Sequence, residues 1–167
     1  MPNWCSNYLD IVGEDDDIKA FRKEAIDVHP TLGDETLSFQ KLKPMPERLN
    51  GTAMGWYDWR CEHWGVKWEP TDCDITDDEG GIFFAFDSPW GPPLKLLETV
   101  IEQYPKLSFS LEYEEWGMDF YGTFEAQEGK VTKNESYEGI NERNHARGDH
   151  EPEPEEYCVV CNPEEEA

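Results

Sequence analysis

Positive charge is scarce in this chain. Its 167 residues include 14 lysines and arginines against 38 aspartates and glutamates, which gives a formal net charge of −24 at pH 7. Nucleic-acid binding relies on cations that replace the counterions of the phosphates, so this charge argues against a protein that binds nucleic acid directly. It also argues against attachment to an anionic membrane surface. It favours a basic partner, or simply a solvated acidic surface.

Long apolar runs are missing as well. No segment approaches the roughly 20 apolar residues of a membrane-spanning helix, and no basic stretch followed by an apolar run marks a secretory leader. The sequence therefore predicts a soluble, cytosolic protein. Its five cysteines are an odd number, and in that compartment disulfides are not expected to organise the fold.

The sequence also lacks the usual catalytic constellations. Cys61 and His63 are two residues apart, so they would not face each other on a helix as a nucleophile and its base. No glycine-rich phosphate loop is present. The acidic stretch 71–79 lacks the glycine and the distal glutamate of a calcium loop, so it predicts a solvated loop. We expect a protein without enzymatic activity.

Apolar periodicity predicts a mixed α+β domain. Strands are expected over 5–12, 36–42, 82–88 and 107–113, and helices from the carboxylates at 14–17 to a stop at Pro30 and over 89–105. This β-α-β-β-α-β order is that of the ferredoxin-like fold, in which two helices pack on one face of a four-stranded antiparallel sheet. A C-terminal hairpin is expected over 119–137, with its turn at Glu128-Gly129.

An aromatic-rich insert separates the second and third predicted strands. It covers about residues 47–80, where a short helix over 56–64 and a short strand over 66–68 are expected, and connections of this length are often functional. The sequence therefore predicts a ferredoxin-like domain at 1–137. Residues 138–167 are polar and proline-interrupted, which predicts an acidic, flexible tail.

The tail carries a candidate metal site. Cys158 and Cys161 have the spacing that lets two thiolates bind one tetrahedral zinc, and His145 and His150 could complete it. Two other interpretations remain open. One is a redox C-x-x-C pair, which normally precedes a helix of a thioredoxin-like unit, and the other is a tail without metal.

Four sequence blocks resemble a known family. MPNWCSN at the start, WR-x-x-x-WGVKW in the middle, FDSPWGPP before the second helix and WGMDFYG near 120 are similar to the YubB-type ferredoxin-like domain family. The resemblance covers about residues 1–126; the family more often has threonine where this chain has Val66. It implies a ferredoxin-like fold and an origin in bacteriophages or conjugative plasmids, and it names no catalytic residue.

Aromatic residues make up 13% of the chain, with seven tryptophans. Because the first strand is central in this fold, its start is well placed to meet the insert, and we expect the rings to gather at one end of the sheet. They could merely cover the core, or they could form an open cup that receives a ligand or a partner side chain. The candidate binding residues are Trp4, Trp59, Arg60, His63, Trp64, Lys67, Trp68, Trp90, Trp116 and Asp119.

These features predict a non-enzymatic accessory binding protein of a bacteriophage or plasmid. Its expected partner is a host protein with a basic nucleic-acid-binding surface, which it would engage as an anti-defence inhibitor or an acidic DNA mimic. The alternative is a small-molecule or nucleotide-binding protein that uses the tryptophan-lined pocket. A zinc-bound tail that serves as a docking element is a third possibility.

Overall fold

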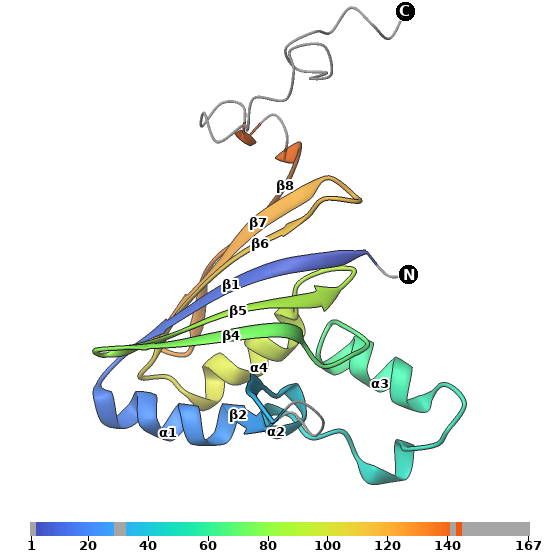
Figure 1. The fold of residues 1–167 in the computed structure, drawn as a ribbon, viewed down its shortest axis with the longest axis horizontal. Helices are drawn as coiled ribbons and strands as arrows, with labels where there is room; N and C mark the ends of the chain where they lie inside the picture. The colour runs from blue at the N-terminus through green and yellow to red at the C-terminus, as the bar shows by residue number, and fades with distance from the viewer. Residues whose placement is uncertain (1–2, 29–32, 141–142, 145–167) are drawn as a thin grey trace, which may run out of the picture.

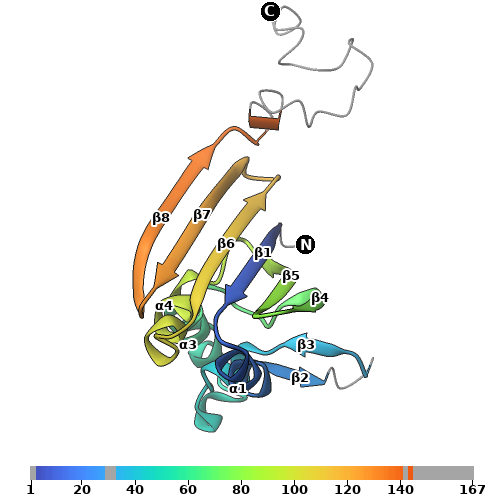
Figure 2. The same ribbon diagram turned by 90° about the vertical axis from the view of Figure 1, so that its left-hand side faces the viewer.

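The structure is a computed structural model that describes residues 3–28, 33–140 and 143–144. Its centre is a six-stranded sheet in the order β4-β5-β1-β6-β7-β8, in which all neighbours are antiparallel (Figures 1 and 2). The strands are β1 (Trp4–Val12), β4 (Thr71–Asp78), β5 (Gly81–Pro89), β6 (Ser108–Glu115), β7 (Phe120–Gln127) and β8 (Lys130–Glu138).

Two helices complete the ferredoxin-like core. They are α1 (Asp15–Ala25), which begins with carboxylates that suit a helix N-terminus, and α4 (Leu94–Gln103), which follows two prolines. The chain order β1-α1-β4-β5-α4-β6 is the β-α-β-β-α-β of that fold, with β1 between β5 and β6. The predicted α+β fold class is therefore confirmed.

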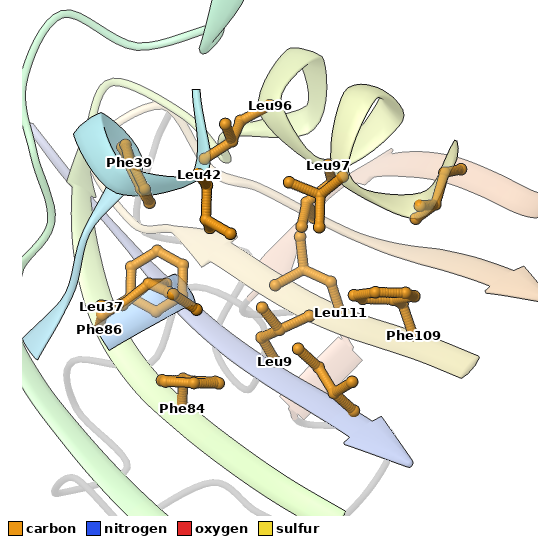
Figure 3. Packing of buried hydrophobic residues seen from close by; sticks show 14 of the residues in the cluster. Leu9, Leu37, Phe39, Leu42, Phe84, Phe86, Leu96, Leu97, Phe109 and Leu111 are labelled. Carbon is orange, nitrogen blue, oxygen red and sulfur yellow. The ribbon is translucent and has the colours of Figure 1, made fainter. Parts of the chain in front are cut away.

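The core lies between the sheet and the helices, which gather on one side of it (Figure 1). Along β1 every second residue is buried, so Leu9 and Ile11 face the helices while Tyr8 and Asp10 face away. Figure 3 shows α2 (Phe39–Leu42) and α4 pointing Phe39 and Leu97 toward the sheet. In the described part of the chain, no helix or strand covers the opposite face, which we call the open sheet face.

The prediction of a strand over 36–42 is wrong. The chain instead forms the short strand β3 (Glu35–Leu37), which pairs with β2 (Ile26–Val28) in a separate sheet, and then turns into α2. Ser38 begins this helix because its Oγ accepts the Lys41 N–H at 3.3 Å. The predicted first helix also ends early, at Ala25, because the next residues pair as β2.

The second strand of the main sheet, in chain order, is β4. It lies in the acidic stretch 71–79, for which the sequence predicts a solvated loop. It is an edge strand on which only Cys73 and Ile75 are half-buried, so its apolar alternation is weak. The aromatic-rich insert consequently lies between α1 and this strand, and not between the second and third strands of the sheet. The insert includes η1 (Glu47–Leu49) and α3 (Gly55–His63), and the strand predicted over 66–68 is absent from this described segment.

The hairpin predicted over 119–137 is present as β7 and β8, which extend the sheet beyond the ferredoxin-like core. Its turn lies at Glu128 and Gly129, whose φ values of 52° and 72° are those of a tight hairpin turn. The candidate zinc ligands His145, His150, Cys158 and Cys161 all lie outside the described residues. Within those residues, no helix is long and apolar enough to cross a membrane.

Candidate functional site

Six of the seven tryptophans form two clusters and not one cup. The first, the sheet-end cluster, consists of Trp4, Lys67, Trp68 and Trp90. The ring centroids of Trp4 and Trp68 are 6.4 Å apart, and the Lys67 Nζ lies 3.9 Å from the Trp68 centroid and 5.8 Å from that of Trp90. All three rings are more than one-third exposed. The first residue of β1 thus meets the insert at this end of the sheet.

A buried polar network fixes the loop that carries Trp90. Asn7 is fully buried, and its Nδ2 donates to the Cys5 carbonyl at 2.8 Å and to the Ser88 Oγ at 2.8 Å. The Ser88 hydroxyl donates in turn to the Gly91 carbonyl at 2.7 Å. Trp90 has a φ of 73°, and its N–H donates to the carbonyl of Asn3 at 3.0 Å. The exposed indole therefore rests on a rigid turn.

The second cluster, the α3 cluster, consists of Trp56, Trp59, Arg60, His63 and Trp64. Trp64 is fully buried and belongs to the core, and its Nε1–H donates to the Lys43 carbonyl at 2.9 Å. The His63 ring stacks on Trp59 with centroids 4.3 Å apart, and its Nδ1–H donates to the Trp59 carbonyl at 2.8 Å. His63 is thus held by Trp59, which lies one turn earlier in the same helix.

Arg60 connects the α3 cluster to a pocket of about 730 Å³. Its Cζ lies 4.7 Å from the Trp64 centroid and 5.6 Å from that of Trp56, which places the guanidinium against two indoles. Trp68 lines the same pocket, so this cavity links the two clusters. Burial, as its main cause, raises the pKa of Glu69, which also lines the pocket.

The remaining predicted residues lie elsewhere. Trp116, at the β6–β7 turn, is half exposed, and its Nε1–H donates to Glu114 at 3.3 Å. Asp119 holds the chain after β8, since its Oδ1 accepts the Ile140 N–H at 2.9 Å. No aromatic contact joins Trp116 to either cluster in the described part of the chain. Both residues therefore serve the β6–β7 turn and the end of β8.

The open sheet face carries residues that the sequence interpretation missed. Tyr8, Tyr121 and Tyr137 line a pocket of about 320 Å³ on it, together with Glu112 and Arg143. The rings of Tyr121 and Tyr137 stack with centroids 5.4 Å apart. The period-two alternation of β1 and β7 could have revealed these positions, because Tyr8 and Tyr121 occupy positions that alternate with the buried residues of their strands.

Across residues 3–28, 33–140 and 143–144, no group of three or more histidine, cysteine, aspartate or glutamate side chains is arranged to hold a metal ion. Cys61 and Cys73 are half-buried free thiols. The zinc prediction concerns the tail alone and stays a prediction.

Comparison with known proteins identifies the domain. A family model described as the ferredoxin-like domain in Api92-like protein matches residues 63–155. The crystal structure of a protein Api92 from Yersinia pseudotuberculosis is similar with a TM-score of 0.65 and 10% sequence identity, and the match covers 82% of this chain and 98% of that one. No curated protein matches the chain. At this identity the structural likeness concerns the fold alone.

Proposed function

The chain belongs to the family of Api92-like proteins that have a ferredoxin-like domain, and from this premise we propose that it is a binding module that engages a basic partner protein through its open sheet face. It acts by recognition and carries out no reaction. The resemblance to YubB-type proteins supports a bacteriophage or plasmid origin. The partner would then be a host protein whose basic surface normally meets nucleic acid.

The distribution of carboxylates on the open sheet face carries this proposal. Residues paired across an antiparallel sheet point to the same side, so the strand register defines three rows on this face. The rows are Asp87-Ser6-Glu114-Tyr121-Tyr137, Asp74-Ala85-Tyr8-Glu112-Thr123-Glu135 and Thr76-Phe83-Asp10-Ser110-Glu125-Lys133. Carboxylates recur in every row, whereas Lys133 is the only basic residue among the three. The face is thus acidic from one edge of the sheet to the other.

One side chain shows how this face receives a cation. Arg143 follows β8, and its Nη2 lies 2.6 Å from the Glu114 Oε2 while its Cζ lies 4.4 Å from the Tyr121 centroid. A carboxylate and a ring thus hold one guanidinium together. Glu112 has no hydrogen bond or ion pair within the described ranges, and it stands beside Tyr8 in the register. Tyr8 and Glu112 can receive a partner's arginine in the same way.

The electrostatics of Tyr8 support a negative potential here. The pKa of its hydroxyl is raised, first by partial burial and then by the carboxylates of Glu114 and Asp87. A surface of this kind accelerates the encounter with a basic protein and binds it more weakly as salt rises. Imitation of nucleic-acid phosphates and inhibition of a host defence protein are specific forms of this role.

The test uses an arginine-rich peptide as a defined probe. We expect its affinity, measured by calorimetry, to fall about tenfold or more when salt rises from about 50 to about 200 mM. The double variant Glu112→Gln/Glu125→Gln should bind the peptide more weakly than the wild type. The matched control Glu98→Gln/Glu102→Gln removes the same charge from α4, on the helical side of the sheet, and should bind nearly as the wild type does.

Two results would contradict the proposal. Equal weakening in both double variants would mean that net charge acts without a specific face. Binding that does not depend on salt would exclude electrostatic recognition. The same variants can then be tested for competition with duplex DNA for host nucleic-acid-binding proteins, where only the open-face variant should lose the ability to compete.

A further inference from the structure

Arg60 is a cation without a carboxylate partner in a chain crowded with carboxylates. Among the residues that the structure describes, the ion pairs use Lys19, Arg22, Lys95, Lys106, Lys133 and Arg143. Arg60 makes none, although acidic residues outnumber basic ones by more than two to one. Other described cations, such as Lys43 and Lys67, also lack an ion pair, but Arg60, which is partly buried, differs from them in that it lines the pocket that Trp68 also lines.

The guanidinium of Arg60 is positioned but only partly hydrogen-bonded. The rings of Trp56 and Trp64 contact it, and its Nη1 donates to the Lys67 carbonyl at 3.3 Å. Its Nε is buried and has no hydrogen-bond partner within the described segments. A guanidinium has five N–H donors, and a buried donor without a partner costs about 1–3 kcal/mol. Arg60 is thus held in place, and its Nη2 makes no hydrogen bond within the described segments.

The acid beside Arg60 is already used. The Glu69 carboxylate accepts the N–H groups of Phe39 at 2.7 Å and of Gln40 at 2.9 Å, where it holds the start of α2. Each of its oxygens is directed at one of these backbone donors. Glu69 therefore anchors the local backbone and forms no ion pair with Arg60; burial raises the pKa of Glu69, and the nearby Arg60 charge partly opposes that rise.

The pocket next to Arg60 has a suitable size and lining for a small ligand. Its volume of about 730 Å³ falls within the range of about 300–1,000 Å³ that is typical of ligand sites. The partly exposed Trp68 indole provides a flat apolar surface, and Met45 and Leu37 add apolar contacts. Asn50 provides a polar group at the same cavity. The guanidinium of Arg60 and the indole of Trp68 thus line the same cavity.

We propose that this pocket binds a small monocarboxylate with a flat apolar body, with the carboxylate on Arg60 and the body against Trp68. The planar fork of arginine matches a carboxylate in bidentate geometry. A dianion such as phosphate fits less well, because Asp27 and Glu69 also line the cavity and repel a second negative charge. A neutral ligand can accept hydrogen bonds from Arg60 but would leave its positive charge without a counter-charge. The inference does not rest on the open sheet face.

The experiment compares defined probes on the full chain. Indole-3-acetate and benzoate are titrated by calorimetry and by the NMR signal of the Trp68 indole N–H, alongside the corresponding amides and inorganic phosphate. We expect the carboxylates to shift the Trp68 signal, and the amides and phosphate to bind about tenfold more weakly or not at all. Failure of both carboxylates to bind, or equal binding of the amides, would overturn the proposal.

Variants assign the carboxylate to Arg60. Arg60→Gln should lower the affinity for indole-3-acetate about tenfold or more, since a charge-assisted hydrogen bond is lost. Lys106→Gln, which removes the same charge from a surface ion pair with Asp17, should leave it unchanged. Arg60→Lys retains the charge without the fork, and it serves as the test if Arg60→Gln does not fold. Undiminished binding by Arg60→Gln, or by Arg60→Lys where that variant replaces it, would overturn the assignment, and so would equal loss in Lys106→Gln.

Discussion

The substitution Asn7→Asp tests the polar network that supports the sheet-end cluster. The Asn7 Nδ2 donates toward the carbonyls of Cys5 at 2.8 Å and Phe86 at 3.2 Å and toward the Ser88 Oγ at 2.8 Å. Aspartate has nearly the same shape, but it replaces this donor with a carboxylate oxygen that faces the other oxygens. The side chain is fully buried, so water cannot relieve the conflict.

The magnitude follows from two contributions. Each lost hydrogen bond weakens the folded state by about 1 kcal/mol, and a buried charge left without a partner brings the total to about 3–5 kcal/mol at neutral pH. For a domain of this size that corresponds to a fall in Tm of roughly 10 °C. Asn7→Ala loses the hydrogen bonds without adding a charge, so we expect a smaller loss of about 1–3 kcal/mol.

The pH dependence separates the charge from the lost hydrogen bonds. Burial and the facing oxygens raise the pKa of the introduced carboxyl above its unfolded value of about 3.9. The folded variant therefore binds this proton more tightly than the unfolded variant does. Its deficit relative to the wild type is smallest near pH 4 and grows as pH rises, until the carboxyl is ionised in the folded state as well.

The assay is urea unfolding followed by tryptophan fluorescence, carried out on wild type, Asn7→Asp and Asn7→Ala from about pH 4 to about pH 8. We expect the difference in unfolding free energy between the two variants to widen with pH, while that between Asn7→Ala and the wild type stays constant. An Asn7→Asp variant as stable as Asn7→Ala throughout this range would refute the reasoning.

Three further predictions concern the core and the insert. Gly122→Ala should lower the unfolding free energy by about 1–3 kcal/mol, because a Cβ there would overlap the Tyr113 ring and the Glu135 carbonyl; an unchanged urea midpoint would contradict this. Burial raises the pKa of Cys5 to about 12, so at pH 8 iodoacetamide should leave this thiol unmodified until urea unfolds the chain, and mass spectrometry of the native protein would show any exception. Burial also raises the pKa of Glu69, whose ordinary value is 4.5. The wild type should therefore lose stability relative to Glu69→Gln as the pH rises above that value. If the unfolding free energies of the two proteins changed in parallel with pH, this prediction would be wrong.

Within the ferredoxin-like core, the strands that could be predicted from sequence are those whose apolar pattern reflects burial. The segments at 5–12, 82–88 and 107–113 each alternate or run apolar, and they are the three neighbouring strands of the ferredoxin-like core. The strand β4 could not be predicted in this way, because it is an edge strand with little buried apolar surface. Its strand conformation comes from pairing with β5, a contact that local sequence does not encode.

The segment at 36–42 shows a different limit of sequence reasoning. Leu37 and Phe39 alternate as in a strand, yet a helix begins after Ser38. The helix is stabilised by the carboxylate of Glu69, which lies 30 residues beyond Phe39 along the chain. No local pattern contains this contact. The insert was misplaced because the strand predicted over 36–42 was counted as the second strand of the sheet, and that second strand is in fact β4.

The candidate residues were predictable in kind but not in arrangement. The sequence singled out Arg60 and Lys67 because cations are scarce, and both contact indole rings in the structure. It did not predict that Trp64 would be fully buried in the core while Trp68 stays partly exposed. That difference depends on how α3 packs, since this short helix buries none of its own residues completely.

The way in which cations are held explains how one acidic chain can present two opposite electrostatic environments. An ion pair cancels both of its charges, and six of the described cations are neutralised in this way. An aromatic ring attracts a cation through its quadrupole and leaves the formal charge in place. Arg60 and Lys67 lie against indoles, so no ion pair cancels their charges despite the net charge of −24. On the open sheet face Glu114, Glu125 and Glu135 are ion-paired, whereas Asp10, Asp74, Asp87 and Glu112 make no ion pair within the described residues. We therefore propose that the two surfaces select partners of opposite charge, and the loss of Arg60 should affect small-anion binding without affecting recognition of a basic protein.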